Sequence, residues 1–389
     1  MKKQVLVVTG LLILASVCVV WVYLLIFGVP KDSSDIFSDF GFPTESSQET
    51  PINNTTNEVF EGNTIDISST EKLSQLTIRP VAGWQSIIVS TTTEKLIYAE
   101  QGTGHIYEIN INTGEESRID GTTIPGTQSV FFSTNGKSAV FISEASGVLI
   151  NILRLEDSTQ IELPTGSDNF QFLGNSTLLY TVTNAAGSTG YSYNTESEVH
   201  TELFNTPFGE ISVIWTDTGN YLYNKPSPHL EGSLYQAAGT NLKSILPSQY
   251  NLTAFSNLAG DTFLYTAVDI LDQQLRTKAL RNGSIREVPI LGVKDKCVFS
   301  DDDNNIVWCG SPQETMGDKD ELSNWYKGVQ QFSDNLWEID LSTQTGSFLL
   351  NFTKFSGREI DIDKIQVNVT ENRLYFRNKI DNTLWLFNL

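Results

Sequence analysis

The sequence is poor in the residues that most often carry enzyme chemistry. Its 389 residues include three cysteines, three histidines and two methionines. His105, His200 and His229 lie far apart, and none has a second candidate ligand at the spacing that a metal site needs. There is also no phosphate-binding loop and no Gly-x-Ser-x-Gly nucleophile motif. The sequence therefore offers no clear catalytic residue, no metal site and no cofactor.

Positive charge is scarce as well. The chain has 25 lysines and arginines against 46 aspartates and glutamates, and its formal net charge is −21. Such a surface repels the phosphates of nucleic acids and anionic lipids. We therefore expect no nucleic-acid partner. The acidity either keeps an exposed domain soluble or attracts basic partners.

Charge is absent between Lys3 and Lys31, and this stretch is strongly apolar. As a helix, residues 5–29, from Val5 through Trp21 to Val29, would extend roughly 36 Å, which is long enough to cross a bilayer. The apolar run is longer than that of a secretory signal peptide. The sequence therefore predicts a transmembrane signal anchor, and the membrane is a predicted partner.

The orientation of the anchor follows from the lysines in front of it. Lys2 and Lys3 favour a cytoplasmic tail at residues 1–4, which leaves the rest of the chain outside, in the periplasm or at the cell surface. A lipoprotein-like "LASVC" around Cys18 is an alternative, although valine precedes the cysteine where a small residue is expected. Residues 30–63 are rich in Ser, Thr, Asn and acidic residues, which predicts a flexible stalk.

From residue 64 to 389 the pattern changes to short alternating apolar runs separated by turns, which is typical of β-strands. One unit recurs at intervals of 42, 40, 43, 42, 43 and 67 residues. Its equivalent positions are Tyr98, Val140, Tyr180, Tyr223, Tyr265, Trp308 and Tyr375. A period near forty with about four strands per unit predicts an all-β fold, a seven-bladed β-propeller, with six or eight blades as alternatives. The last unit has three strands, so we expect residues 72–80 to add the fourth and close the ring.

Two of the three cysteines lie in "KCVFSDDDNNIVWCG", residues 296–310. A turn at residues 301–305 would place Cys297 opposite Cys309 on neighbouring strands. Outside the cytoplasm such a pair can form a disulfide, whereas in the cytoplasm it would remain two buried thiols. We expect the disulfide.

The long interval comes from an insertion at residues 310–334. Loops of this length in compact domains are usually functional or disordered. Trp325, Tyr326 and Lys327 at its centre favour order and partner binding, because exposed aromatic residues often carry binding energy. Asp318 and Asp320 on its acidic flank would favour a basic rim on a partner. In the alternative interpretation, the aromatic residues only cap the edge of a blade.

Several of these segments also suggest a family. The anchor, "RPVAGW", "GTGHIYEININTGE", "TTIPG", "KCVFS…VWCG" and "DELSNWYKG…FSDNLWEIDLSTQTG" resemble uncharacterised membrane-anchored β-propeller proteins of candidate phyla radiation bacteria. The turns are more loosely similar to Tol-type and Trp-Asp-type (WD40-like) propeller repeats. The resemblance covers most of the chain from Arg79 and implies an anchored propeller without an established activity.

Together these features predict a protein-binding or scaffold module at the cell envelope, with an unknown envelope protein or a glycan as its partner. The alternative is an envelope hydrolase or lyase that acts on glycans. Its acid and nucleophile would come from Glu210, Asp295, Asp361 and Asp363, which lie near the starts of inner strands at the mouth of the channel. Propellers serve both purposes, so the fold does not decide between them.

Overall fold

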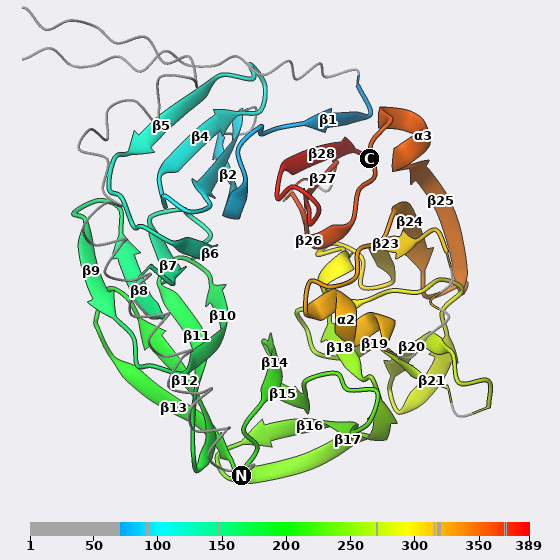
Figure 1. Cartoon of the computed structure of the whole chain (residues 1–389). Helices are drawn as coiled ribbons and strands as arrows, with labels where there is room; N and C mark the ends of the chain where they lie inside the picture. The colour runs from blue at the N-terminus through cyan, green and yellow to red at the C-terminus, as the bar shows by residue number, and fades with distance from the viewer. Residues whose placement is uncertain are drawn as a thin grey trace, which may run out of the picture. The chain divides into compact units, whose positions relative to one another are not determined.

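Seven four-stranded antiparallel sheets form a ring in the computed structural model, which describes residues 71–389 apart from 91–92, 146–147, 270, 315, 317–319, 369 and 371. Figure 1 looks along the axis of the ring, and strands that open a sheet, such as β10 (Ser167–Leu173) and β14 (Ile211–Thr216), lie nearest to its centre. This is a seven-bladed β-propeller. The predicted fold is confirmed, and six or eight blades are excluded.

In the first six blades the innermost strand comes first in the chain and the outermost comes last. Blade one consists of β2 (Val81–Ser90), β3 (Thr93–Glu100), β4 (Ile106–Asn110) and β5 (Glu116–Asp120). Blade two consists of β6 (Thr127–Phe132), β7 (Ser138–Ser143), β8 (Leu149–Arg154) and β9 (Thr159–Glu162). Blade three consists of β10, β11 (Thr177–Asn184), β12 (Gly187–Asn194) and β13 (His200–Thr206). Blade four consists of β14, β15 (Gly219–Asn224), β16 (Glu231–Ala238) and β17 (Asn241–Tyr250). Blade five consists of β18 (Thr253–Ser256), β19 (Thr262–Val268), β20 (Leu275–Arg281) and β21 (Ser284–Glu287). Blade six consists of β22 (Cys297–Phe299), β23 (Ile306–Pro312), β24 (Asp334–Asp340) and β25 (Thr345–Asn351).

The seventh blade combines the two ends of the described chain. Its inner strands are β26 (Ile362–Val367), β27 (Arg373–Asn378) and β28 (Leu384–Asn388), and its outer strand is β1 (Leu73–Gln75). β1 pairs antiparallel with β28, with Leu73 opposite Phe387. An ion pair of 2.6 Å between Arg373 Nη1 and Glu94 on β3 links this blade to the first. The ring is therefore closed by chain segments about 300 residues apart in sequence.

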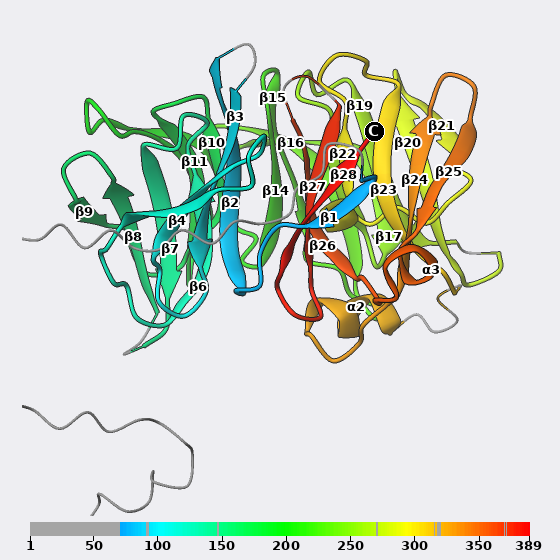
Figure 2. The ribbon, with the colours of Figure 1, turned by 90° about the horizontal axis from the view of Figure 1, so that it is seen from above.

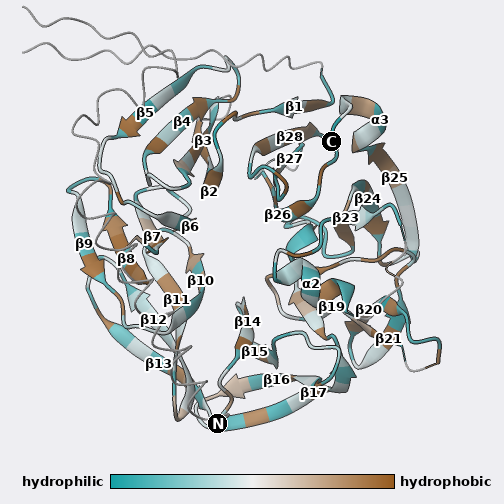
Figure 3. Cartoon of the chain, viewed as in Figure 1, coloured by the Kyte–Doolittle hydropathy of each residue, from teal (hydrophilic) through white to brown (hydrophobic). Residues whose placement is uncertain are grey.

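The core consists of apolar layers between neighbouring blades. One cluster, for example, joins Ile97 of the first blade to Val130 and Phe141 of the second. Gly83 lies at this seam, where a Cβ atom would fall 1.9 Å from the carbonyl oxygen of Val130. This close approach explains why only glycine fits at position 83. The outer strand β17 carries both hydrophilic and hydrophobic residues (Figure 3), and most of its side chains are exposed.

Cys297 and Cys309 form a disulfide and are paired opposite each other on β22 and β23. The predicted register is observed throughout this hairpin, because Val298 faces Trp308 and Phe299 faces Val307. The prediction of a disulfide is confirmed. It joins the first two strands of the blade from which the insertion arises.

Helical structure is limited in the described part of the chain. A 3-10 turn, η2 (Lys294–Lys296), precedes β22; α2 (Glu321–Tyr326) lies in the insertion; and α3 (Phe352–Ser356) follows β25. Figure 2, turned by 90°, shows α2 at one end of the blades. Within residues 71–389, with the gaps given above, no helix is long and apolar enough to span a membrane.

Three predictions lie outside the described residues. These are the cytoplasmic tail at 1–4, the anchor at 5–29 with Val5, Trp21 and Val29, and the stalk at 30–63. Asp318, which we predicted to contribute to binding, also lies outside them. All four remain predictions.

Candidate functional site

The insertion, the loop of the fourth blade between β15 and β16, and the segments that lead into β14 and β22 all lie on the same face of the propeller. In an antiparallel sheet, the link into the first strand and the link from the second to the third strand leave at the same end. Glu210 and η2 belong to the first kind of link, and the loop at 225–230 and α2 belong to the second. This face therefore brings together residues from several blades.

A buried ion cluster fixes the base of the insertion. Lys296, fully buried on η2, pairs at 2.6 Å with Oδ2 of Asp334 and also with Oδ1 of Asp361. Both carboxylates have lost contact with water as well. The backbone N–H of Ile362 donates to Asp334 at 2.8 Å, and that of Phe332 donates to Asp361 at 3.0 Å. The cluster joins η2, the end of the insertion and the seventh blade.

Despite these contacts, burial disfavours the charged forms of Asp334 and of the neighbouring Lys379. Burial raises the pKa of Asp334 to about 6, with Asp361 adding to the effect and Lys296 opposing it. Oδ1 of Asp334 is buried and has no hydrogen-bond partner within the described part of the chain. Burial also lowers the pKa of Lys379, which donates to the carbonyl oxygen of Trp325. A buried pair of this kind is costly to break, because the remaining charge is left without a partner.

Trp325 belongs to this cluster and is not a surface residue. Only 2% of it is exposed, and its indole N–H donates to both oxygens of Asp361 at 3.0 Å. It packs with Leu322 and Met316, and Nζ of Lys379 lies 3.6 Å from the centre of its ring. The expectation that its side chain is a contact surface needs correction, because Asp361 accepts its N–H inside the protein. Trp325 holds α2 onto the propeller.

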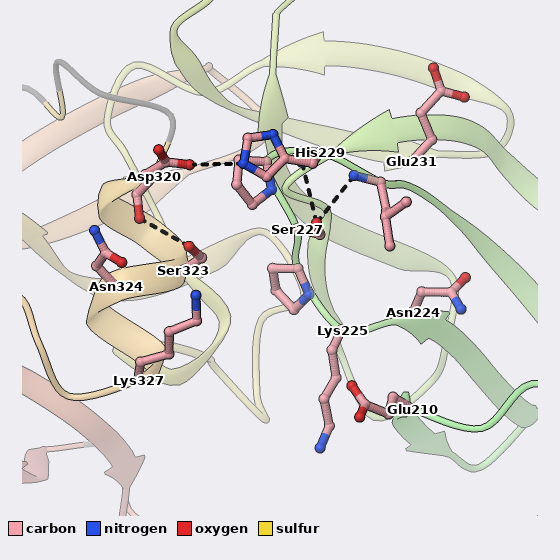
Figure 4. Close-up of a pocket in the computed structure, with 13 residues that line it drawn as sticks. Glu210, Asn224, Lys225, Ser227, His229, Glu231, Asp320, Ser323, Asn324 and Lys327 are labelled. Atoms are coloured by element: carbon pink, nitrogen blue, oxygen red, sulfur yellow. Dashed lines mark hydrogen bonds and ion pairs between the residues drawn. The ribbon is translucent and has the colours of Figure 1, made fainter. Parts of the chain in front are cut away.

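An open cleft of about 750 Å³ lies beside α2. Figure 4 shows α2 with Asp320 and Lys327 on one side, and the β15–β16 loop with His229 on the other. Nε2 of His229 and Oδ1 of Asp320 lie 3.8 Å apart and bridge the two walls. The lining residues are Glu210, Asn224, Lys225, Pro226, Ser227, Pro228, His229, Leu230, Glu231, Asp320, Ser323, Asn324 and Lys327.

The cleft adjoins a second hollow of about 440 Å³ at the mouth of the channel, which we call the chamber. Glu210, Lys225, Pro226, Ser323 and Lys327 line both. The other lining residues of the chamber are Ser212, Tyr223, Lys294, Asp295 and Tyr326. The shared wall makes one continuous depression from the rim of the propeller to its channel.

The chamber contains interacting charged and phenolic groups. Tyr326 is 39% exposed, and its partial burial, followed by the negative charge of Asp295, raises the pKa of its phenol above the usual value. For Lys294, burial acts to lower the pKa, but Tyr223 and Asp295 outweigh it and the pKa is raised. Lys294 therefore remains protonated at neutral pH.

The four carboxylates that we considered for catalysis lie in different surroundings, and two of them are held in internal ion pairs. Asp361 is buried in the ion cluster, and Asp363 accepts two hydrogen bonds from Arg377, at 2.9 and 2.7 Å. Glu210 and Asp295 both line the chamber. Within the described part of the chain, no group of three or more His, Cys, Asp or Glu side chains is placed to hold a metal ion.

Of the residues predicted for binding, Tyr326, Lys327 and Asp320 line these hollows and Trp325 does not. Sequence analysis missed Lys225, which follows β15 of the fourth blade, and Lys294, which lies on η2 ahead of β22. The segment "KPSPHLE", residues 225–231, was a usable signal, because two prolines between strands of one unit indicate a stiff connection. No local sequence pattern pointed to Lys294.

Comparison with known proteins gives structural matches only. No protein-family model and no curated protein matches the chain. An oligogalacturonate lyase in complex with manganese matches with a TM-score of 0.54 and 11% identity, over 84% of this chain and 96% of that one. An oligogalacturonate lyase from Vibrio parahaemolyticus matches with a TM-score of 0.54 and 10% identity, over the same shares.

A third match is the β-propeller domain of the trilobed protease from Pyrococcus furiosus. Its TM-score is 0.52 at 11% identity, over 79% of this chain and 95% of that one. At such low identity these similarities show the fold alone. The function has to be argued from the residues of this chain.

Proposed function

We propose that the protein is a membrane-anchored, extracytoplasmic binding module of the cell envelope, and that it holds a segment of an envelope glycan in the cleft and chamber. The observation that carries this proposal is the convergence of Tyr326, Lys327 and Asp320 with the proline-rich loop of the fourth blade around one depression. Hollows of several hundred Å³ are typical of sites for small or narrow ligands.

The lining favours a polar, hydroxyl-rich ligand. Ser227, Ser323 and Asn324 provide hydroxyl and amide groups, and Glu210 and Glu231 provide acceptors for ligand hydroxyls. A globular protein would use a larger and flatter surface with an apolar centre. A glycan segment suits a narrow polar depression better than such a partner does.

Binding is favoured over catalysis by the state of the carboxylates. Asp334 and Asp361 are buried and share the ammonium group of Lys296, so a substrate has no access to them. Asp363 is held by Arg377. A hydrolase or lyase would have to depend on Glu210 and Asp295.

The location outside the cytoplasm is supported by the disulfide between Cys297 and Cys309, because such bonds persist in oxidising compartments. It is also supported by Lys2 and Lys3 in front of the apolar segment. Protease added to intact spheroplasts should release a fragment that begins within residues 30–63. Complete protection of the chain would contradict the proposed orientation.

A glycan array probed with the full-length protein in detergent tests the binding function. Asn324 lies on α2 in the wall of the cleft (Figure 4), so Asn324→Trp should fill the cleft and abolish the wild-type signals. Asn241→Trp, at an exposed position on the outer strand β17, is the matched control and should retain them. Signals that survive Asn324→Trp would place binding elsewhere, and an array without signals would contradict a glycan ligand.

A further inference from the structure

The buried ion cluster holds an amine against two carboxyl groups. Lys296, Asp334 and Asp361 are all fully buried. Nζ of Lys296 lies 2.6 Å from Oδ2 of Asp334 and also contacts Oδ1 of Asp361. The ring centres of Trp325 and Phe332 lie 4.9 and 5.6 Å from the same nitrogen. A nucleophilic atom and two acyl groups are therefore enclosed together beside aromatic rings.

Such surroundings favour the neutral forms of these groups. Transfer of a proton from Lys296 to Asp361 turns an ammonium group and a carboxylate into an amine and a carboxylic acid. Burial favours this change, because a low-dielectric interior disfavours charge. A desolvated neutral lysine is a nucleophile, and a carboxylic acid can accept its attack at carbon. The two can therefore condense to an amide and release water.

The contacts of Asp361 suit it to be attacked. Its Oδ2 accepts the indole N–H of Trp325 and the backbone N–H of Phe332, both at 3.0 Å. The indole nitrogen is also 3.0 Å from Oδ1, the oxygen that contacts Lys296. Two donors on Oδ2 stabilise the negative charge that develops there when an amine attacks the carboxyl carbon. The same donors can bind the carbonyl oxygen of the amide afterwards.

Asp334 is placed to move the protons. Its Oδ2 lies beside the attacking nitrogen and accepts the backbone N–H of Ile362 at 2.8 Å. Its Oδ1 is buried without a hydrogen-bond partner among the described residues, so it can carry the proton of the acid form. Burial is the largest cause that raises the pKa of Asp334 to about 6. An acid with a pKa near neutrality can both give and take a proton during a reaction.

We infer that Nζ of Lys296 and Cγ of Asp361 are joined by an isopeptide bond, and that Asp334 acts as general acid and base in its formation. Lys296 passes one proton to Oδ1 of Asp361, and the nitrogen then attacks Cγ. Asp334 gives a proton to Oδ1, which leaves as water, and takes one back from the nitrogen. The nitrogen keeps one hydrogen, Asp334 ends as an acid, and water is the only product released.

The bond ties together parts of two blades. Lys296 belongs to η2 ahead of blade six, and Asp361 directly precedes β26 of blade seven. The insertion returns to blade six at Asp334, between these two groups. The bond therefore fixes the base of the insertion covalently, in addition to the disulfide of the same blade. This inference does not depend on the proposed glycan-binding function.

Mass spectrometry of the full-length protein, reduced and denatured, tests the inference directly. The chain should be lighter than its unmodified sequence by one water molecule, about 18 Da. A protease digest should contain a branched peptide, and tandem spectra should place the branch at Lys296 and Asp361. A chain of unmodified mass would overturn the inference, as would a loss of water located elsewhere. A branch from Lys296 to Asp334 would also overturn it, because it would reverse the roles of the two carboxyl groups.

Four variants test the individual roles. Lys296→Met should have its unmodified mass. Asp361→Asn keeps an acyl group in place, so it should form the bond with loss of ammonia in place of water. Asp334→Asn keeps the shape of the side chain but cannot exchange protons as an acid, and should leave the bond unformed; a complete bond in this variant would overturn the role of Asp334. Lys243→Met, at an exposed position of β17, is the matched control and should lose one water like the wild type. The wild-type spectrum decides the existence of the bond even where a variant fails to fold.

Discussion

The pH dependence of stability offers a sharp test of the buried ion cluster, through the substitution Asp334→Asn. The pKa of Asp334 is raised from 3.8 to about 6, chiefly by burial. Because the folded-state pKa lies above the unfolded-state value, folding takes up a proton between about pH 4 and pH 6. The stabilising contribution is complete below about pH 4 and is lost as the pH rises through 6. At about 1.36 kcal/mol per pKa unit, the loss amounts to about 3 kcal/mol.

The assay is urea unfolding of the full-length protein and the variant, followed by tryptophan fluorescence from about pH 4 to pH 7.5. Asparagine is neutral at every pH, and all other groups are shared. The free energy of unfolding of the wild type minus that of the variant should therefore fall by about 2 to 3 kcal/mol across this range. A difference that stays constant to within about 0.5 kcal/mol would refute the reasoning.

Asp340→Asn is the matched control for this measurement. Asp340 is a surface residue, and hydrogen bonds from Ser342 and Thr343 lower its pKa to about 2. Its contribution to stability is present above about pH 4 and is lost only as the pH falls through 2. The corresponding difference for this variant should therefore be flat between pH 4 and pH 7.5.

Three further predictions concern the fold. Cys297→Ser with Cys309→Ser should lower the free energy of unfolding by about 2 to 3 kcal/mol, because the bond closes a short loop, and thiol titration of the unfolded, non-reduced wild type should find neither of these cysteines free. Deletion of residues 72–80 should prevent cooperative unfolding, because it removes β1 and uncovers β28; a melting curve like that of the wild type would contradict ring closure. Trp325→Ala should cost about 3 to 5 kcal/mol, as expected for a buried aromatic residue. Tyr326→Ala, at a partly exposed position, should cost clearly less and should weaken ligand binding; equal effects of the two on stability would contradict the different roles assigned to them.

The parts of the fold that could be predicted from sequence are those specified by local patterns. The spacing near forty residues and the tight turns follow from strands of about six residues that alternate in polarity, so blade number and hairpin register were accessible. The pairing of Cys297 with Cys309 is of this kind, because a turn of known length sets which residues face each other.

The environment of Trp325 could not be predicted in this way. Sequence shows an aromatic residue in a long polar insertion, and such a residue either binds a partner or packs. Its burial depends on Lys296 and Asp361, which precede the first strands of two different blades and lie 29 and 36 residues away along the chain. The same holds for Lys364, whose aromatic contacts come from the first two blades while it lies in the last. Contacts between distant blades leave no local pattern.

The short turn η2 carries residues of both the chamber and the buried ion cluster. In a 3-10 helix successive side chains point about 120° apart, so three consecutive residues face three directions. Lys294 and Asp295 line the chamber, whereas Lys296 turns into the buried cluster that fixes the insertion. Cys297 follows directly and forms the disulfide with β23. Through Cys309 and Asp334, the disulfide and the ion cluster thus fix the two ends of the insertion, whose helix α2 lines the cleft. Rigid support of this kind keeps binding groups in place before the ligand arrives, which lowers the entropic cost of binding.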